Sequence, residues 1–366
     1  MKFECATEKL RNAVLLASRF TSRQVNLPIL RTILIAVNGT EVVLRATNLE
    51  CGVEIMLPAR IEDSGVVAVP GEILNGFLSN LGSEKAVTLK KEGNTLFITA
   101  QKAKAQMKTL APDEFPILPS VSGEKSFKMK GHDLATLIRS VAFCAATSGV
   151  KPELQSVMLY GESNKLYAIA TDSFRLAEKT ILPRGLSTLP QLLLPLKNAA
   201  ELARLLEGVL EEIEVYYNEN QLAMRSDGIY YTSRLIDGTF PDYRSIIPKS
   251  YTSEAVLLRG DLSQALKLIA VFADKFAQVG VTVSPGKKTV TFTARNVEVG
   301  ENTVTLKAAV SGEEIHMTFN GRYLADSLLG ITHESVKFGF SGPGKPLAIQ
   351  GATDGSFLYI VMPMNR

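Results

Sequence analysis

The sequence has few of the side chains that bind metals or form disulfides. Its 366 residues include three cysteines and three histidines. The cysteines are odd in number and lack the spacing of a metal site, which favours a reducing compartment such as the cytoplasm. The histidines are scattered and have neither an H-x-x-x-H spacing nor cysteine partners. The sequence therefore predicts no disulfide framework and no metal site.

Nucleotide-binding and hydrolase motifs are also missing. The chain has no G-x-x-x-x-G-K-[ST], G-x-G-x-x-G or G-x-S-x-G segment. The glycine-rich stretch 342–345 is followed by proline, so it predicts a turn rather than a phosphate-binding loop. A metal cluster of Asp172, Asp237 and Asp242 is an alternative, but aspartates beside Thr, Gly and Pro favour turns. We predict no catalytic residue and no cofactor, although catalytic groups that meet only in space leave an enzyme as an alternative.

Long apolar runs are absent as well. No stretch approaches the roughly 18 apolar residues that cross a bilayer. The first residues, MKFECATEKLRNAVLL, lack the apolar core and cleavage site of a signal peptide. With 46% hydrophobic and 21% charged residues, the composition is typical of a globular protein. The net charge of +3 is too small to diagnose nucleic-acid binding. We expect a cytoplasmic protein with no membrane partner.

One strand-and-turn segment occurs three times in the chain. The three versions are GTEVVLRATNLE at 39–50, SNKLYAIATDSF at 163–174 and KKTVTFTARNVE at 287–298. Their common spacing of 124 residues is the length of a domain and too long for a solenoid repeat. The sequence therefore predicts three tandem copies of one domain, at 1–120, 121–250 and 251–366.

Each copy is predicted to contain two helices and about eight strands. Near the start of each copy, apolar residues recur at i, i+3, i+4 and i+7, which indicates an amphipathic helix. A second strand and helical run follow at VAVP, LLLP and MTFN. Thr7 and Asp261 are the expected N-caps of the first helix in copies one and three. Each copy should thus hold two β-α-β-β-β halves in an α+β fold.

Basic side chains lie within or beside the predicted helices, among them Arg139, Lys197, Arg204 and Lys267. A basic face shared by the helices would meet phosphates without reading bases. The alternative is a solvated helix face, and for any single charge that interpretation is favoured.

Three separated segments resemble the bacterial DNA polymerase III beta subunit family, the replicative sliding clamps. They are ATDSFRLA at 170–177, DGTFPDYRSIIP at 237–248 and YIVMPMNR at 359–366. The resemblance covers the whole chain and its three-copy plan. It implies the DNA-clamp fold, in a ring-shaped homodimer with helices lining the hole and sheets outside. It also implies a processivity factor without catalytic activity, which encircles duplex DNA independently of sequence.

The resemblance implies several protein partners. They are the alpha subunit of the replicative DNA polymerase, a clamp-loader ATPase, and other proteins with a clamp-binding motif, such as translesion polymerases, ligase and mismatch-repair proteins. It places the protein in the cytoplasm, at the nucleoid.

The resemblance also assigns residues to three sites. The pocket for partner peptides corresponds to Thr171, Phe174, Arg175, Leu176, Pro241, Ile246, Ile247, Asn320, Tyr323, Val361, Met362, Pro363 and Met364. The DNA-facing residues are Arg23, Gln24, Arg139, Lys151, Lys197, Arg204 and Lys267. At the dimer interface, Met107 of one chain is expected to meet Val271 and Phe272 of the other. The ATNLE and ARNVE versions of the repeated segment differ from ATDSFRLA, so the second copy alone is expected to supply that side of the pocket.

Two other classes of function remain as alternatives. An enzyme with a dispersed active site predicts perturbed carboxylates clustered in a cleft. A repeat scaffold that binds other proteins predicts no common basic face on the helices.

Overall fold

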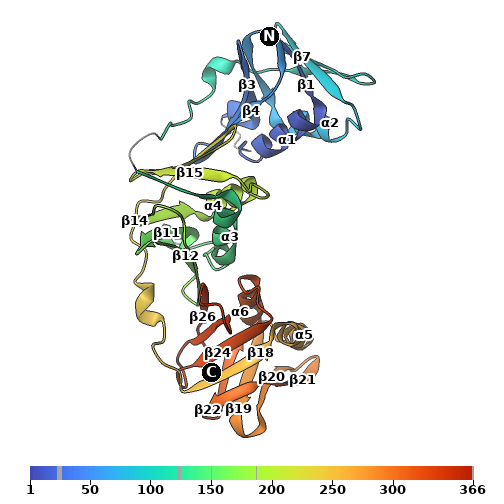
Figure 1. The fold of residues 1–366 in the computed structure, drawn as a ribbon. Helices are drawn as coiled ribbons and strands as arrows, with labels where there is room; N and C mark the ends of the chain where they lie inside the picture. The colour runs from blue at the N-terminus through green and yellow to red at the C-terminus, as the bar shows by residue number, and fades with distance from the viewer. Residues whose placement is uncertain (23–26, 122–124, 150, 187, 365–366) are drawn as a thin grey trace. The chain divides into compact units, whose positions relative to one another are not determined.

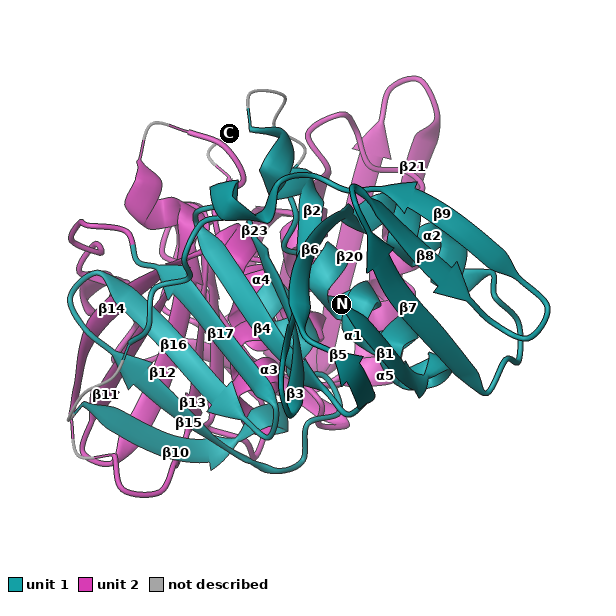
Figure 2. Ribbon diagram, turned by 90° about the horizontal axis from the view of Figure 1, so that it is seen from above, with its two compact units in different colours: residues 1–132, 201–235 teal, residues 133–200, 236–366 magenta. Residues whose placement is uncertain are grey.

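The computed structural model describes residues 1–22, 27–121, 125–149, 151–186 and 188–364. The chain divides into two compact units, coloured separately in Figure 2. Unit 1 consists of Met1–His132 and Glu201–Leu235, and unit 2 of Asp133–Ala200 and Ile236–Arg366. Each unit therefore holds one terminal copy of the predicted domain together with part of the central copy.

Unit 1 contains a five-stranded and an eight-stranded antiparallel sheet. The strand orders are β5-β1-β7-β8-β9 and β10-β15-β16-β17-β4-β3-β2-β6. The strands are β1 (Lys2–Ala6), β2 (Thr32–Asn38), β3 (Glu41–Thr47), β4 (Cys51–Leu57), β5 (Arg60–Asp63), β6 (Gly65–Pro70), β7 (Ala86–Glu92), β8 (Thr95–Thr99), β9 (Lys104–Lys108), β10 (Ser126–Lys130), β15 (Glu212–Tyr217), β16 (Gln221–Ser226) and β17 (Ile229–Arg234). Two helices of this unit, α1 (Thr7–Ser18) and α2 (Gly71–Ser79), pack against each other (Figure 1).

Unit 2 contains a nine-stranded and a four-stranded antiparallel sheet. The strand orders are β14-β11-β12-β13-β26-β25-β24-β18-β22 and β21-β20-β19-β23. The strands are β11 (Ser156–Glu162), β12 (Lys165–Thr171), β13 (Arg175–Ile181), β14 (Leu189–Pro195), β18 (Ser253–Leu258), β19 (Gln278–Ser284), β20 (Thr289–Asn296), β21 (Gly300–Lys307), β22 (Ala309–Gly312), β23 (Ile315–Asn320), β24 (Ser335–Phe340), β25 (Leu347–Gly351) and β26 (Phe357–Val361). Its helices α5 (Arg259–Ala270) and α6 (Gly321–Asp326) also pack together, while α3 (Gly131–Ala142) and α4 (Leu196–Leu205) each contain residues of both units.

The structure confirms the predicted α+β class and the predicted helices. The three versions of the repeated segment form the equivalent strands β3, β12 and β20. The apolar positions that predicted the first helix of each copy are buried, as Leu10, Leu134 and Leu262 illustrate. Within the described residues, no helix is long and apolar enough to cross a membrane.

The two predicted N-caps are wrong. Helix α1 begins at Thr7 itself and α5 begins two residues before Asp261, and neither helix has a side-chain cap. The first N–H of each helix donates instead to a backbone carbonyl far away in the sequence, from Thr7 to Lys85 at 3.1 Å and from Arg259 to Glu334 at 2.7 Å. The carbonyls of Lys85 and Glu334 thus accept hydrogen bonds from N–H groups at the helix N-termini, where the prediction expected the side chains of Thr7 and Asp261 to accept them. Among the described helices with a defined cap, only α6 uses a side chain, that of Asn320.

Strand pairing continues each large sheet from one predicted copy into the next. In unit 1, β4 of copy one pairs with β17 of copy two. In unit 2, β13 of copy two pairs with β26, the last strand of the chain. The turn before β4 and the turn before β13 belong to the repeated segment, so that segment lies at a junction between copies in both units.

Asn320→Ala is expected to destabilise unit 2 by about 1 kcal/mol. Its side-chain oxygen accepts hydrogen bonds from the N–H groups of Arg322 and Tyr323, and loss of such a cap typically has this cost. Asp261→Ala, which removes no cap, should cost only about 0.3 kcal/mol through the helix dipole. Urea unfolding followed by circular dichroism tests both variants, and equal losses would contradict the assignment of the cap.

Candidate functional site

A hydrogen-bonded turn between β12 and β13 presents the side chain of Phe174. The hydroxyl of Thr171 accepts from the N–H of Ser173 at 3.1 Å and donates to the carbonyl of Arg175 at 2.7 Å. Oδ1 of Asp172 accepts from the N–H groups of Phe174 and Arg175, both at 3.0 Å. Thr171 and Asp172 therefore shape the turn, and Phe174 at its tip is 62% exposed.

The C-terminal tail runs beside this turn. In the β13–β26 pair, Arg175 is opposite Val361, and the next N–H of the tail, that of Met362, donates to the carbonyl of Phe174 at 2.9 Å. Two residues later, the N–H of Met364 donates to the carbonyl of Thr318 at 2.8 Å. The tail is thus held at two points, and Met362, which is 37% exposed, adjoins Phe174.

The segment that follows Ile236 supplies further apolar residues. Phe240 and Tyr243 are buried in one cluster with Leu176 of β13, and Ile247 packs against that cluster. Ile246, on the same segment, is 41% exposed. The cluster therefore fixes this segment on the face of β13 that Leu176 occupies.

A hydrogen-bond network locks the same segment in place. The hydroxyl of Tyr243 donates to Glu178 of β13 at 2.6 Å and lies 2.8 Å from the hydroxyl of Tyr160. Arg244 donates to the hydroxyl of Tyr160 at 2.7 Å and to Glu162 at 2.6 Å. Burial raises the pKa of the Tyr243 hydroxyl, and the hydrogen bond to Glu178 raises it further.

The side chain of Arg175 connects elements from both sides of the junction. Its Nε donates to Asp172 at 3.0 Å, one terminal nitrogen donates to Asp326 of α6, and the other donates to the carbonyl of Phe143 at 2.8 Å. The guanidinium carbon lies 4.4 Å from the centre of the Tyr323 ring, a cation–π distance. Burial alone would lower the pKa of this guanidinium, but hydrogen bonding to Asp326 raises it. Arg175 therefore stays charged and holds α6 against the turn.

The structure brings most residues of the predicted pocket into one region of unit 2. Residues 171–176 and 361–364 are joined by backbone hydrogen bonds, Tyr323 meets Arg175, and Ile247 packs on the cluster of Leu176. The side chain of Asn320 is engaged as the cap of α6. Pro241 and Ile246 lie on the segment that carries Tyr243, and both are exposed.

Sequence reasoning missed several residues that position this region. They include Asp326, Phe143, Glu178 and Tyr160, which bind Arg175 or Tyr243. No sequence signal marks Asp326, because it lies 151 residues from Arg175. Tyr243 lies in the DGTFPDYRSIIP segment, and the resemblance of that segment to the family was the one sequence feature that could have pointed to Tyr243.

The predicted DNA-facing residues are distributed over both units. Arg23 and Gln24 lie outside the described residues. Arg139, Lys151, Lys197, Arg204 and Lys267 are all exposed. Arg204 and Arg19 both lie near the carboxylate of Glu201, so part of their charge is compensated.

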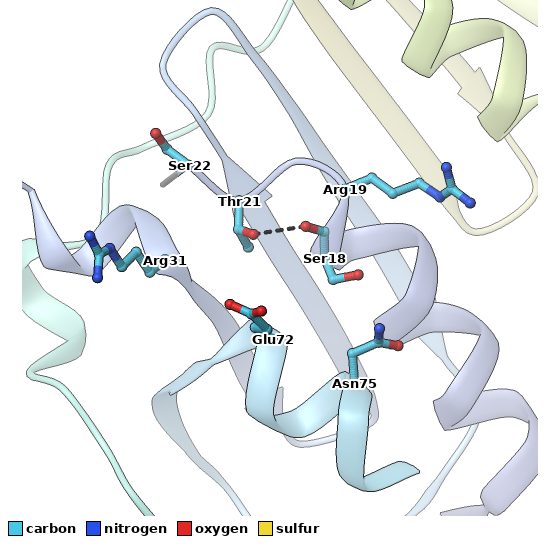
Figure 3. Close-up of a pocket in the computed structure, with 7 residues that line it drawn as sticks. All are labelled: Ser18, Arg19, Thr21, Ser22, Arg31, Glu72 and Asn75. Atoms are coloured by element: carbon cyan, nitrogen blue, oxygen red, sulfur yellow. Dashed lines mark hydrogen bonds between the residues drawn. The ribbon is translucent and has the colours of Figure 1, made fainter. Parts of the chain in front are cut away.

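A polar cleft of about 720 Å³ lies where α1 ends beside α2 (Figure 3). Its lining consists of Ser18, Arg19, Thr21, Ser22, Arg31, Glu72 and Asn75. In Figure 3 the carboxylate of Glu72 points into the cleft, whereas the guanidinium of Arg19 points away from Glu72. The hydroxyl of Thr21 donates to the carbonyl of Ser18 at 2.7 Å, which fixes the chain as it leaves α1. The cleft therefore presents mixed charge.

The residues predicted for the dimer interface differ in exposure. Val271, just after α5, is 68% exposed, and Phe272 is half-buried. Met107 is buried within its own copy. Its strand, β9, is the edge of the five-stranded sheet, and β21 is the edge of the four-stranded sheet. A carbon placed on Gly300 of β21 would lie 3.9 Å from the Phe272 ring, so β21 runs beside Phe272.

The titratable groups of the described residues have pKa shifts that structural contacts and burial explain. Among the described residues, no group of three or more His, Cys, Asp or Glu side chains is arranged to hold a metal ion. The carboxyl groups of Glu62, Glu214 and Asp354 have lowered pKa values, the direction that hydrogen bonds and ion pairs produce. Burial raises the pKa of the Cys144 thiol, which disfavours a nucleophilic thiolate.

Arg175→Ala is expected to destabilise unit 2 by about 3 kcal/mol, because Asp326 and Asp172 would lose their partly buried counterion. Arg244→Ala serves as a matched control. Its pair with Glu162 is exposed on both sides, and the Tyr160 hydroxyl, which it also contacts, keeps Tyr243 as a partner, so its removal should cost only about 1 kcal/mol. The measurement is urea unfolding of both variants. If Arg175→Ala lowered the free energy of unfolding no more than Arg244→Ala, the partly buried contacts of Arg175 would not be stronger than the exposed contacts of Arg244.

The free energy of unfolding is expected to fall as pH rises above 10. The native pKa of Tyr243 lies above the ordinary value of 10.0, so the unfolded chain loses this proton at a pH where the native protein keeps it. The stabilisation is fully present below pH 10 and is lost as pH rises through the native pKa. Urea unfolding at several pH values between about 9 and 11 tests this, with Tyr243→Phe as the control. The variant should show a shallower decline, and identical slopes would contradict the assignment.

Sequence models of three domains of the DNA polymerase III beta subunit match the chain in order. The N-terminal domain matches residues 1–119, the central domain residues 128–242 and the C-terminal domain residues 244–365. Together the three matches span nearly the whole chain.

Individual relatives agree with this result. The beta sliding clamp of Staphylococcus epidermidis is 27% identical over 354 residues, covering 94% of this chain and 94% of the relative. The beta sliding clamp of Synechococcus elongatus is 26% identical over 374 residues, covering 100% of this chain and 99% of the relative.

Solved structures show the same fold. The crystal structure of the DNA polymerase III beta subunit from Thermotoga maritima matches with a TM-score of 0.94 and 26% identity, over 100% of this chain and 99% of that one. The corresponding structure from Pseudomonas aeruginosa matches with a TM-score of 0.93 and 26% identity, over 100% of both chains. The predicted clamp fold is confirmed, and the family is one of accessory subunits without catalytic activity. The chain belongs to the DNA polymerase III beta subunit family, the beta sliding clamps.

Proposed function

We propose that two copies of this chain close around duplex DNA and tether the replicative polymerase to it. The observation that carries the proposal is the match of three beta-subunit domains, in order, along the whole chain. The copy boundaries after residues 120 and 250, and a location in the cytoplasm at the nucleoid, belong to the same proposal.

The partner-peptide pocket is proposed at the junction around Phe174 in unit 2. Phe174, Ile246 and Met362 expose apolar side chains from backbone segments that hydrogen bonds or a buried cluster hold in place. A rigid frame reduces the entropy lost on binding, and flexible methionine side chains adapt to different peptides. The surface suits short apolar segments of several partners: the polymerase alpha subunit, a clamp-loader ATPase, and the translesion polymerase, ligase and mismatch-repair proteins that carry such motifs.

Contact with DNA is proposed through exposed cations on the helices. Arg139, Arg204 and Lys267 lie in the last turns of α3, α4 and α5, where the helix dipole favours a positive charge. Lys197 is the second residue of α4, where the dipole disfavours it. Helix stability therefore does not account for Lys197, whereas contact with phosphate would. Lys151, Arg23 and Gln24 complete the proposed set.

The dimer is proposed to form between β9 of one chain and β21 of the other. Both are edge strands, whose unpaired N–H and C=O groups can pair with a second chain. Phe272 lies beside β21 and Val271 precedes it, and both would add apolar burial. In this arrangement Met107 supports the interface from beneath β9, because its side chain is buried.

Encirclement can be tested on a nicked circular plasmid loaded in the presence of the cognate loader. The protein is expected to stay on the circle and to be released when the plasmid is cut once, because encirclement, and not the affinity of the proposed phosphate contacts, retains it. Retention on the linear DNA, with a steep dependence on salt, would show that phosphate contacts alone hold the protein and would contradict encirclement.

Deletion of Met362–Arg366 is expected to abolish stimulation of the polymerase while leaving the dimer intact. The deletion removes Met362 and the hydrogen bond from Met364 to Thr318, but no residue of β9 or β21. Leu182→Asp is the control, since Leu182 is an exposed apolar residue just after β13 and outside the proposed pocket. Primer extension and sedimentation are the two measurements. If the shortened protein still stimulated the polymerase fully, the tail would not be part of the pocket.

A further inference from the structure

The junction between copies one and two, in unit 1, repeats the turn that presents Phe174. The hydroxyl of Thr47 accepts from the N–H of Leu49 at 3.0 Å and donates to the carbonyl of Cys51 at 2.9 Å. Oδ1 of Asn48 accepts from the N–H groups of Glu50 and Cys51 at 3.0 and 2.8 Å. Leu49 has a φ of 75°, and the equivalent residue of the other turn, Ser173, has a φ of 78°. The two turns share one hydrogen-bond pattern.

The strand beside this turn repeats the course of the C-terminal tail. Ser233 of β17 is opposite Cys51, as Val361 is opposite Arg175. The N–H of Arg234 then donates to the carbonyl of Glu50 at 2.9 Å, which matches the bond from Met362 to Phe174. The linker that follows copy one also begins with Phe-Pro, at 115–116, as the second does at 240–241. Backbone, strand and linker are thus equivalent at the two junctions.

A cavity of about 110 Å³ lies at this junction, between residues 47–52, the linker 116–119 and the adjoining ends of β16 and β17. Two residues that line it are smaller than their equivalents at the second junction. Gly52 stands where the second copy has Leu176, and Leu118 stands where the second linker has Tyr243. A Cβ on Gly52 would overlap Cδ2 of Leu118, so the Leu118 side chain packs directly against the glycine and would have to shift to admit a larger residue. A cavity of about 150 Å³ holds a benzene molecule, so this one can hold one branched aliphatic side chain.

The rim of the cavity exposes apolar side chains on a fixed backbone. Ile117 is 95% exposed, and Leu49 is also exposed. The linker beyond Ile117 is fixed by Tyr230, whose hydroxyl donates to the carbonyl of Pro119 at 2.8 Å and accepts from the N–H of Val121 at 2.9 Å. Neighbouring exposed apolar side chains, here Ile117 and Leu49 beside the cavity, are a feature of docking surfaces, whereas a single exposed one is not.

The charge of the rim differs from that of the proposed partner-peptide pocket. Glu50 and Arg234 stand at the positions of Phe174 and Met362. Both are exposed. A segment that fits here therefore offers fewer apolar side chains than one that fits the pocket at Phe174, and it gains from a carboxylate near Arg234.

We propose that this cavity is a second docking site, which takes one leucine-type side chain, with an acidic residue next to it, from an extended segment of a protein partner. The class of occupant rests on the proposed function of the equivalent pocket in unit 2. The cavity, the rim and the shared backbone frame are independent of it.

The test is methyl NMR of the full chain, labelled at Ile, Leu and Val, with the acetylated pentapeptide Ala-Ala-Leu-Asp-Ala as the probe. The methyl signals of Leu49, Ile117 and Leu118 are expected to shift and to saturate with a Kd of the order of 10 mM, as suits one buried side chain. The same peptide with alanine in place of leucine should cause no shift. Replacing its aspartate by lysine should weaken binding to the wild type and should have no effect on an Arg234→Ala variant.

Two variants separate this proposal from the proposed function. Ile117→Asp changes an almost fully exposed residue, so the fold is preserved, and it should abolish the shifts at Leu49 and Leu118. Met362→Asp should leave them unchanged. Shifts confined to Leu176, Ile246 and Ile247 would overturn the second site and support the pocket at Phe174. Shifts confined to the first junction would support the second site. The absence of shifts at both places would overturn the second site, and the pocket at Phe174 would remain to be judged by the deletion of Met362–Arg366.

Discussion

Antiparallel pairing between a strand of one copy and the hairpin of the preceding copy is the constraint on which the rest of the structure depends. An isolated copy would leave β13 with one unpaired edge, and such edges associate with other chains. Pairing with β26 satisfies the edge and extends the sheet of copy two into copy three. The β4–β17 pair does the same in unit 1. The contacts of Arg175, the position of the tail and the segment around Tyr243 all depend on this pairing.

The same constraint places the candidate pocket at a junction between copies. Phe174 comes from the hairpin of one copy and Met362 from the last segment of the next, and one hydrogen bond joins their backbones. A peptide bound there would contact both copies at once, so the binding surface exists only while the junction is closed. The cavity at Gly52 and Leu118 occupies the equivalent place in unit 1. Its different residues show how one frame can present two chemically distinct surfaces.

Local sequence patterns predicted the elements, but they did not predict how distant parts meet. Periodicity located the helices that bury Leu10, Leu134 and Leu262, because amphipathic spacing is a local property. The predicted caps of α1 and α5 were wrong because the first N–H of each helix donates to a distant backbone carbonyl, that of Lys85 or Glu334. No local pattern marks these carbonyls. The Arg175–Asp326 pair spans 151 residues and was missed for the same reason. The family resemblance predicted the pocket residues, whereas the role of Asn320 as a cap required the structure.

The central claim is that strand pairing makes each junction a stable part of the fold. Native-state hydrogen exchange measures this directly, because protected amides exchange only when the surrounding structure opens. The amides of β26 are expected to be as protected as those of β12, in the interior of the same sheet, and far more protected than those of its edge strand β22. Exchange of β26 at the rate of β22 would show that the junction opens independently, and it would contradict the account.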